Sequence, residues 1–161
     1  MTYWFLSDLH LGHTRVAEDR GFTLTPEHDL AVLNSIADTT KREGVLYLLG
    51  DIWWGHFIKN HLNYFPKQVH LIYGNHDDLL RKENIFTSQQ EMKYIKIEGQ
   101  KIHLCHYPMA SWRSSPYGSW HLHGHTHGRC PQQRNRLDVS WEVIKRPFSF
   151  EEVRELLICS F

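Results

Sequence analysis

Three short apolar runs, each followed at once by polar residues, constrain the fold of this chain most. They are rich in β-branched and aromatic residues and end in polar residues or glycine, as buried strands do. The runs are "TYWFLS" (2–7), "VLYLLG" (45–50) and "QVHLIYG" (68–74). Between the first two, residues 25–43 predict a helix, with Thr25 as N-cap and Pro26 at the first helical position. The alternation of strand and helix predicts an α/β fold with parallel pairing at its centre.

In the second half of the chain, apolar and polar residues alternate with a period of two. "KYIKIEG" and "KIHLCHY" alternate around "EGQK", which predicts a β-hairpin leading into a second, partly antiparallel set of strands. "WHLHG" and "RLDVSW" predict further strands. "SFEEVRELL" (149–157) predicts a helix, because Ser149 and Glu152 have the spacing of a capping box. The segment "RLDVSWEVIKRPFSF" shows no assignable chemistry in the sequence.

Length and composition indicate one soluble globular domain over residues 1–161. Hydrophobic residues make up 41% and charged residues 22%, and no stretch is apolar for long enough to span a bilayer. The N-terminus does not have the pattern of a signal peptide, so we expect a cytoplasmic protein. The three cysteines lack paired spacing, which argues against a disulfide framework or a zinc ribbon.

The charge balance narrows the classes of partner. Lysine plus arginine and aspartate plus glutamate both total 18, so no global field indicates nucleic acid or a membrane surface. A polymer of nucleic acid is therefore not indicated, although a local basic patch is not excluded by this balance. Nothing in the composition indicates an oligomeric state.

Polar residues of the metal-ligand type follow the predicted strands in order. Because the carboxyl ends of strands in an open α/β sheet form the ligand-binding edge, we expect these side chains to meet there. They are Asp8 and His10, then Asp51, then Asn75, His76 and Asp77, then His106 after the hairpin, and finally His125 and His127 in "HLHGHTHGRC". Each motif alone is weak, since a lone aspartate is often a helix cap and a histidine-rich run can be a surface loop.

The order of these motifs resembles the calcineurin-like metallophosphoesterase superfamily. Its pattern D-x-H, G-D, G-N-H-[DE], H and G-H-x-H is matched between residues 8 and 127. The resemblance implies a sandwich of two mixed β-sheets flanked by helices, with a site for two metal ions. It implies that Asp51 bridges the ions and that each ion has three further ligands: Asp8, His10 and His127 for one, and Asn75, His106 and His125 for the other.

The resemblance also implies a reaction. Carboxylate, amide and imidazole donors suit two divalent ions, with Mn expected and Fe, Zn, Ni or Co as alternatives, and the absence of thiolates argues against a closed structural zinc site. Two such ions can clamp a phosphoryl group and convert a shared water to the hydroxide that attacks phosphorus in line. His76 would act as general acid with Asp77 orienting its imidazole. The alternative is that His76 only donates to a phosphate oxygen.

The expected substrate is a small phosphoester, with a nucleotide-like diester favoured. The chain lacks the arginine of the G-D-x-V-D-R-G motif of serine/threonine protein phosphatases, having "GDIWWGH" instead, and it has no room for large cap insertions. Stacking on a base would use aromatic residues near the phosphoryl site. The expected substrate contacts are Trp54, Arg113 and His13, and residues 107–119 form the expected substrate loop.

Structural roles and other functions are alternatives to these expectations. Trp53 and Trp120 are expected in the core, His121 and His123 are expected to pack or hydrogen-bond, and His13 could serve only a neighbouring side chain. A phosphomonoesterase of similar mechanism is the main alternative function. A non-catalytic scaffold for a protein partner is another, as in an endosomal sorting subunit related to the superfamily, but such a scaffold should have lost ligand residues. A histidine-rich metal store would not need Asp51 or Asn75 at strand ends.

Overall fold

The computed structural model describes residues 1–53, 58–131 and 133–159. Its first sheet has five strands in the order β4-β3-β2-β1-β9, and all the pairs are parallel except β1 with β9. The strands are β1 (Tyr3–Leu6), β2 (Val45–Leu48), β3 (Gln68–Ile72), β4 (Ser88–Gln90) and β9 (Phe148–Ser149). The three strands expected at the centre of the sheet are therefore confirmed, whereas β4 and β9 are too short to show a period in the sequence.

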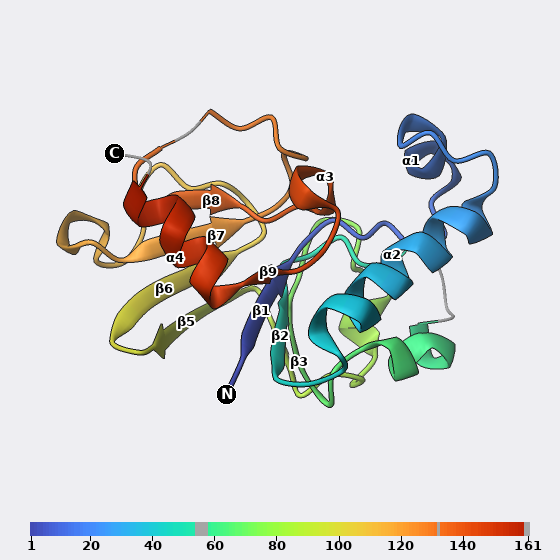
Figure 1. Cartoon of the computed structure of the whole chain (residues 1–161), viewed down its shortest axis with the longest axis horizontal. Helices are drawn as coiled ribbons and strands as arrows, with labels where there is room; N and C mark the ends of the chain where they lie inside the picture. Colours follow the sequence, from blue (N-terminus) through green and yellow to red (C-terminus); the bar gives the residue numbers. More distant parts are fainter. Residues whose placement is uncertain (54–57, 132, 160–161) are drawn as a thin grey trace.

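The second sheet has four strands in the order β5-β6-β7-β8 (Figure 1). The expected hairpin pairs β5 with β6 antiparallel, while β7 and β8 extend the sheet by parallel pairing. Its strands are β5 (Met92–Ile97), β6 (Gln100–Cys105), β7 (Trp120–His123) and β8 (Arg136–Asp138). The hairpin turn places Glu98 and Gly99 at φ +48° and +87°. Both sheets are thus mixed, as expected.

Four α-helices accompany the sheets: α1 (Thr14–Asp19), α2 (Thr25–Thr40), α3 (Trp141–Ile144) and α4 (Phe150–Cys159). Three 3₁₀ helices complete the described elements: η1 (Ile58–Tyr64), η2 (Leu80–Lys82) and η3 (Ser115–Tyr117). No helix within the described ranges has both the length and the apolarity needed to cross a membrane.

The helix expected over residues 25–43 differs from α2 at both ends. Its N-cap is Leu24, which makes no side-chain capping bond, and the Thr25 hydroxyl instead donates to Thr14 Oγ1 at 3.2 Å. The helix stops at Thr40 because Lys41 takes a left-handed conformation at φ +52°. By contrast, the capping box of α4 is confirmed: Glu152 N donates to Ser149 Oγ at 3.2 Å, and Ser149 N donates to Glu152 Oε2 at 2.8 Å.

The alternation of side chains along β1 and β2 divides the core into two layers. Leu6, Leu46 and Leu48 belong to a cluster that also contains the buried α2 residues Val32, Leu33 and Ile36. Phe5 and Tyr47 point to the opposite face, into a cluster with residues of the second sheet and of α4. Both faces of the first sheet are therefore covered, with α2 on one side and the second sheet with α4 on the other (Figure 1). Such two-sided burial explains why these strands are apolar almost throughout.

His121 is fully buried in β7, and its environment favours the neutral imidazole. Nδ1 lies 3.1 Å from the His103 carbonyl, to which it can donate, and Nε2 accepts from Met109 N at 3.2 Å. Burial, together with the neighbouring His123, lowers the pKa of His121 to about 4. His121 and His123, which is 1% exposed and lies 2.9 Å through Nδ1 from the Gly124 carbonyl, thus pack and hydrogen-bond as expected.

Stability should consequently depend on pH through His121. In the unfolded chain its pKa is about 6.5, so between pH 6.5 and 4 the unfolded state binds more protons and the folded state loses stability as the pH falls. The loss attributable to this side chain should approach ~3 kcal/mol at pH 4. Urea unfolding of the wild type and His121→Gln at pH 7 and pH 4.5 measures it, since glutamine can keep both hydrogen bonds without titrating. Equal pH slopes in the two proteins would contradict this prediction.

Candidate metal centre

Five residues expected as ligands lie in left-handed backbone conformations just beyond strand ends. Their φ angles lie between +50° and +68°. The residues are Asp8, His10, Asp51, His125 and His127. Non-glycine residues adopt this conformation rarely and at an energetic cost, and such strain concentrates at functional sites. The tight turns that follow β1, β2 and β7 thus bring side chains from distant parts of the chain to one edge.

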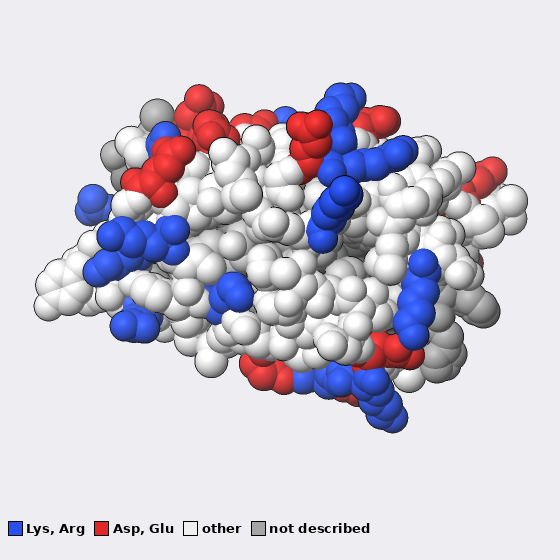
Figure 2. All heavy atoms as spheres, turned by 90° about the horizontal axis from the view of Figure 1, so that it is seen from below, with Lys and Arg blue, Asp and Glu red and all other residues white. Residues whose placement is uncertain are grey.

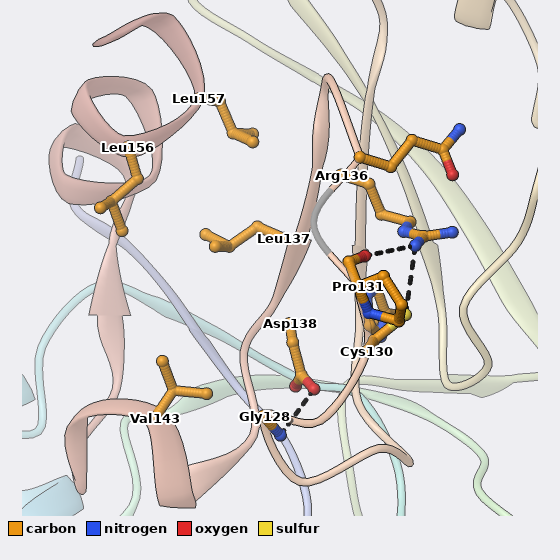
Figure 3. Close-up of a pocket in the computed structure, with 11 residues that line it drawn as sticks. Gly128, Cys130, Pro131, Arg136, Leu137, Asp138, Val143, Leu156 and Leu157 are labelled. Atoms are coloured by element: carbon orange, nitrogen blue, oxygen red, sulfur yellow. Dashed lines mark hydrogen bonds between the residues drawn. The ribbon is translucent and has the colours of Figure 1, made fainter. Parts of the chain in front are cut away.

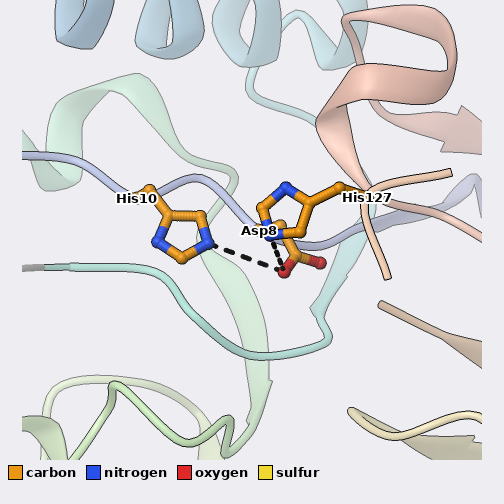
Figure 4. A group of neighbouring side chains, drawn as sticks. All are labelled: Asp8, His10 and His127. Atoms are coloured by element: carbon orange, nitrogen blue, oxygen red, sulfur yellow. Dashed lines mark ion pairs between the residues drawn. The ribbon is translucent and has the colours of Figure 1, made fainter. Parts of the chain in front are cut away.

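The first group of side chains is Asp8, His10 and His127, whose candidate ligand atoms all lie within 4.8 Å of one another. His127 Nε2 lies 3.4 Å and His10 Nε2 3.7 Å from Asp8 Oδ1, so both rings face the same carboxylate oxygen (Figure 4). The other oxygen, Oδ2, accepts hydrogen bonds from His125 N and Ser140 Oγ. The carboxylate is thereby held with Oδ1 directed toward the two imidazoles.

The second group joins Asp51, His106 and His125, again within 4.8 Å of one another. Asn75 contributes its Oδ1, which lies 3.0 Å from His125 Nδ1 and 3.2 Å from His106 Nε2. His106 is completely buried, and its Nδ1 lies 2.6 Å from the Leu49 carbonyl, to which it can donate. That bond would leave Nε2 free to act as a ligand, because a neutral imidazole carries one proton.

Asp51 lies between the two groups. Its Oδ2 is 3.4 Å from His106 Nε2 in the second group and 3.7 Å from His10 Nε2 in the first. Oδ1 accepts a hydrogen bond from His76 N at 3.0 Å. The structure therefore brings all seven expected ligand residues together, in the two sets that the sequence pattern implied.

The donor set fits divalent ions by two observations. Both nitrogens of His10 are buried without a hydrogen-bond partner among the described residues, and an unsatisfied buried polar group is costly unless something binds it. Burial alone would raise the pKa of Asp8, yet the histidines His10, His106 and His127 hold it well below its ordinary value. A buried, ionised carboxylate surrounded by imidazole nitrogens is the environment that a borderline divalent cation prefers.

The structure does not support the role expected for Asp77. Its carboxylate is fully buried and accepts backbone N–H groups through both oxygens: from Ile52 at 2.9 Å on Oδ1, and from Asp51 and Gly74 at 2.9 and 2.7 Å on Oδ2. Asp77 therefore ties the loop after β2 to the loop after β3 and does not orient the His76 imidazole. The ring of His76 instead lies with Nε2 3.9 Å from Asp51 Oδ2, its side chain 36% exposed.

The three residues expected to contact substrate differ in where they lie relative to the candidate metal ligands. The His13 ring lies 5.7 Å from His10 and 6.3 Å from His76 between centroids, and its Nδ1 accepts from Val16 N as the N-cap of α1. The Arg113 guanidinium lies over the Tyr94 ring of β5 at 4.5 Å. Trp54 lies outside the described residues. His13 alone among the three is thus shown beside the ligand groups.

The segment 107–119, expected as a substrate loop, is anchored in its middle. Trp112 is 7% exposed and donates its indole N–H to the Ser119 carbonyl at 3.1 Å. Trp53 and Trp120 are also buried, which confirms their expected place in the core. At the start of the segment, however, Tyr107 is 44% exposed.

Two further residues lie near the ligands: Tyr107, which sequence reasoning placed in the expected substrate loop, and Glu142, which it missed. Tyr107 follows His106 directly, and its ring lies 4.9 Å from that of His125 between centroids. Glu142, in the segment to which no chemistry was assigned, lies with Oε1 2.7 Å from His127 Nδ1. No motif indicates Glu142, because α3 reaches the site only through tertiary packing; its position after the last histidine motif was the only available signal.

A separate pocket lies away from the ligand groups, between β8, α3 and α4 (Figure 3). Leu137, Val143 and Leu156 form its apolar side. Its polar groups are already paired: Arg136 donates to Cys130 Sγ and to the Pro131 carbonyl, as Figure 3 shows. None of the seven expected ligands lines this pocket.

Comparison with known proteins agrees with this geometry. The calcineurin-like phosphoesterase superfamily domain matches residues 1–142. The "Gene 66 protein" of Mycobacterium phage D29 is 31% identical, covering 96% of this chain and 94% of that protein. A protein of unknown function, AQ665 from Aquifex aeolicus, has a similar fold, with a TM-score of 0.74 at 23% identity over 96% of this chain and 98% of that chain.

A characterised structure shares the fold more distantly. YfcE, a phosphoesterase from E. coli, superposes with a TM-score of 0.53 at 18% identity, covering 87% of this chain and 78% of that chain. The family match extends over every strand that supplies a candidate ligand, from Asp8 to His127. The chain therefore belongs to the calcineurin-like phosphoesterase superfamily.

Proposed function

We propose that this protein is a metal-dependent phosphodiesterase that acts on a small, nucleotide-like phosphoester. One observation carries the proposal: two sets of ligand-type side chains face each other across the Asp51 carboxylate. The set of Asp8, His10 and His127 would hold one divalent ion, and the set of Asn75, His106 and His125 the other. The mixture of oxygen and imidazole donors favours Mn, with Fe, Zn, Ni or Co as alternatives.

The ions, when bound, would polarise the phosphoryl group and lower the pKa of a water between them. The protein's part is to hold the donors rigid and to orient the substrate. Backbone hydrogen bonds join the segments that carry Asp8 and Asp51: Asp8 N donates to the Gly50 carbonyl at 3.0 Å, and His10 N donates to the Asp51 carbonyl at 2.9 Å. Preorganised groups of this kind lose little energy to reorganisation during the reaction.

His76 is our candidate for the general acid. Its backbone N–H donates to Asp51 Oδ1, and its exposed ring stands next to His10 at a centroid distance of 5.6 Å. The imidazole is therefore at the solvent side of the metal ligands, where a leaving group would depart. A positioned imidazole can protonate the leaving oxygen as the bond to phosphorus breaks.

Tyr107 provides the described aromatic surface next to the second group. Its ring meets His106 and His125 edge-on at centroid distances of 5.1 and 4.9 Å, and almost half of the residue is exposed. A base or another flat group of the substrate could stack there, at about 1–3 kcal/mol per stacked base. This surface supports a nucleotide-like substrate over a compact one such as a simple sugar phosphate.

A long nucleic acid is less well supported. On the face shown in Figure 2, Lys and Arg side chains form small groups separated by uncharged surface, with Asp and Glu mostly toward the margins. Equal numbers of acidic and basic residues agree with this picture. Binding of a polymer relies on many phosphate contacts from a basic surface, which this face does not offer.

Metal-stripped protein reloaded with Mn, Zn, Ni or Mg tests the proposal on two substrates in parallel. We expect bis-p-nitrophenyl phosphate to be cleaved faster than p-nitrophenyl phosphate, and only with a transition metal. The reverse preference would indicate a phosphomonoesterase. A protein that binds the metals but cleaves neither ester, nor any member of a cyclic-nucleotide and dinucleotide panel, would favour the non-catalytic scaffold.

His76→Ala tests the general acid separately. We expect kcat to fall about 10²- to 10⁴-fold for a diester with an alkoxide leaving group, such as a cyclic nucleotide. The loss should be much smaller for bis-p-nitrophenyl phosphate, because p-nitrophenolate leaves without protonation. His61→Ala, a histidine of η1, is the matched control. The same loss with both leaving groups would contradict an acid role and would favour simple phosphate binding by His76.

A further inference from the structure

Glu142 lies directly behind a candidate metal ligand. His127 donates Nδ1–H to Glu142 Oε1 at 2.7 Å, while its other ring nitrogen, Nε2, points toward Asp8 Oδ1 at 3.4 Å. A carboxylate behind an imidazole in this way fixes both the tautomer and the ring orientation, so that the ligating nitrogen carries the lone pair. Within the described residues, Glu142 Oε2 is buried and without a hydrogen-bond partner, so Oε1 carries the polar contacts of this side chain.

Arg20 binds the same Glu142 carboxylate oxygen that accepts the hydrogen bond from His127. Its side chain is 6% exposed, Nε donates to Glu142 Oε1 at 2.8 Å, and Nη2 makes a second short contact with the same oxygen. The guanidinium also donates to the carbonyls of Asp8 and Leu9, at 2.6 and 3.0 Å. One cation therefore joins the carboxylate behind His127 to the backbone of the turn that carries Asp8.

Contacts of the same guanidinium extend to side chains of α2. Arg20 Nη1 lies 2.8 Å from His28 Nε2, and His28 Nδ1 lies 2.8 Å from Asp29 Oδ1. Asp29 in turn accepts Gly12 N through both oxygens, at 3.0 and 2.9 Å. Gly12 lies two residues after His10, so the chain of contacts begins and ends at loops that carry ligands of the first group.

Removal of the Glu142 carboxylate would leave both Arg20 and His127 without their partner. Arg20 is nearly buried, and a buried cation that loses its partner is destabilised. His127 would lose the partner of Nδ1 and be free to rotate or to change tautomer. The side chains of the second group should be affected less, because they contact other residues: His106 Nδ1 lies 2.6 Å from the Leu49 carbonyl and His125 Nδ1 lies 3.0 Å from Asn75 Oδ1.

We propose that Glu142, held by Arg20, is a positioning residue for one of the two metal ions, the ion of the Asp8, His10 and His127 group. This proposal rests on the metal centre of the proposed function but does not depend on the substrate or on turnover. Loss of such a partner behind a ligand typically weakens metal binding or activity about 10- to 100-fold. The effect should fall on one ion of the pair, which distinguishes positioning from a general loss of fold.

Titration of metal-stripped protein with Mn²⁺ by calorimetry, and with Co²⁺ by visible absorption, tests the proposal without any substrate. Glu142→Ala should bind one ion with wild-type affinity and the other about 10- to 100-fold more weakly. The Co²⁺ spectrum at one equivalent should then report the second group alone. Glu142→Gln keeps an oxygen that can accept the His127 N–H, so it should restore most of the affinity and fold even if the alanine variant does not.

Glu151→Ala on the exposed face of α4 is the matched control and should bind both ions as the wild type does. Far-ultraviolet circular dichroism of the metal-free variants confirms that each is folded. The proposal would be overturned if a folded Glu142→Ala bound both ions as tightly as the wild type and Glu142→Gln do. It would also be overturned if Glu142→Ala weakened the binding of both ions equally. An inactive wild type that still binds two ions would contradict the proposed function while leaving this test decisive.

Discussion

Asp51→Asn should reduce hydrolysis of bis-p-nitrophenyl phosphate by at least about 100-fold, a larger loss than we expect from His76→Ala on the same substrate. Asp51 Oδ2 is the atom that connects the two ligand groups, at 3.7 Å from His10 Nε2 and 3.4 Å from His106 Nε2. Asparagine has nearly the same shape but no negative charge, so it cannot neutralise two neighbouring cations. The substitution therefore removes the electrostatic link between the sites while leaving the packing of this 2%-exposed residue intact.

Initial rates on bis-p-nitrophenyl phosphate over a range of Mn²⁺ concentrations measure this effect. Excess metal should not rescue Asp51→Asn fully, because the bridging position itself is altered. Asp19→Asn, on the surface of α1, is a control of the same chemistry and should retain the wild-type rate. If Asp51→Asn remains nearly as active as the wild type, a bridging role for Asp51 is excluded.

Gly124→Ala should cause the largest loss of stability, about 3 kcal/mol or more in the free energy of unfolding. A β-carbon at residue 124 would lie 1.9 Å from Ser7 Oγ and 2.2 Å from Asp8 Oδ2. Both neighbours are completely buried and hydrogen-bonded, so neither can withdraw. The segment after β7 must therefore either move away from the segment after β1 or displace the Asp8 carboxylate, which would also weaken metal binding.

Gly118→Ala provides the comparison, because a β-carbon there meets nothing within 4 Å and only the left-handed backbone at φ +78° opposes it. Its cost should be about 1–2 kcal/mol. Guanidinium chloride unfolding of both metal-free variants gives the two free energies. Equal losses of stability would show that the close approach of Gly124 to Ser7 and Asp8 costs no more than the backbone strain at Gly118, and would contradict this prediction.

Residues whose roles depend on local pattern were predictable from the sequence. The strands of the first sheet that carry Asp8, Asp51 and Asn75 are short and apolar because both of their faces are buried, and that composition is visible in the chain. The hairpin and the capping box of Ser149 and Glu152 follow from period and spacing alone. The candidate ligand set followed from the resemblance of the motifs after these strands to those of the calcineurin-like superfamily, whose separations within each motif are visible in the chain.

Residues whose roles depend on partners far along the chain were not predictable in this way. Asp77 is adjacent to His76 in sequence, but its carboxylate turns inward to the amides of Ile52, Asp51 and Gly74. Arg113 is close to the motifs in sequence, yet it lies on Tyr94. Adjacency in sequence does not determine the direction of a side chain, because the competing acceptors and rings are supplied by other elements.

The sequence therefore determined the α/β fold class and the edge of the sheet that carries the candidate site, and its motifs, through their resemblance to a known family, indicated the seven candidate ligands. Only the tertiary structure decided what holds those ligands: the Leu49 carbonyl behind His106, and Glu142 with Arg20 behind His127. The physical reason is the difference between local and non-local interactions. Backbone turns and strand ends are set by neighbouring residues. Arg20, the C-cap of α1, and Glu142 of α3 are 122 residues apart, and only the tertiary fold brings them together.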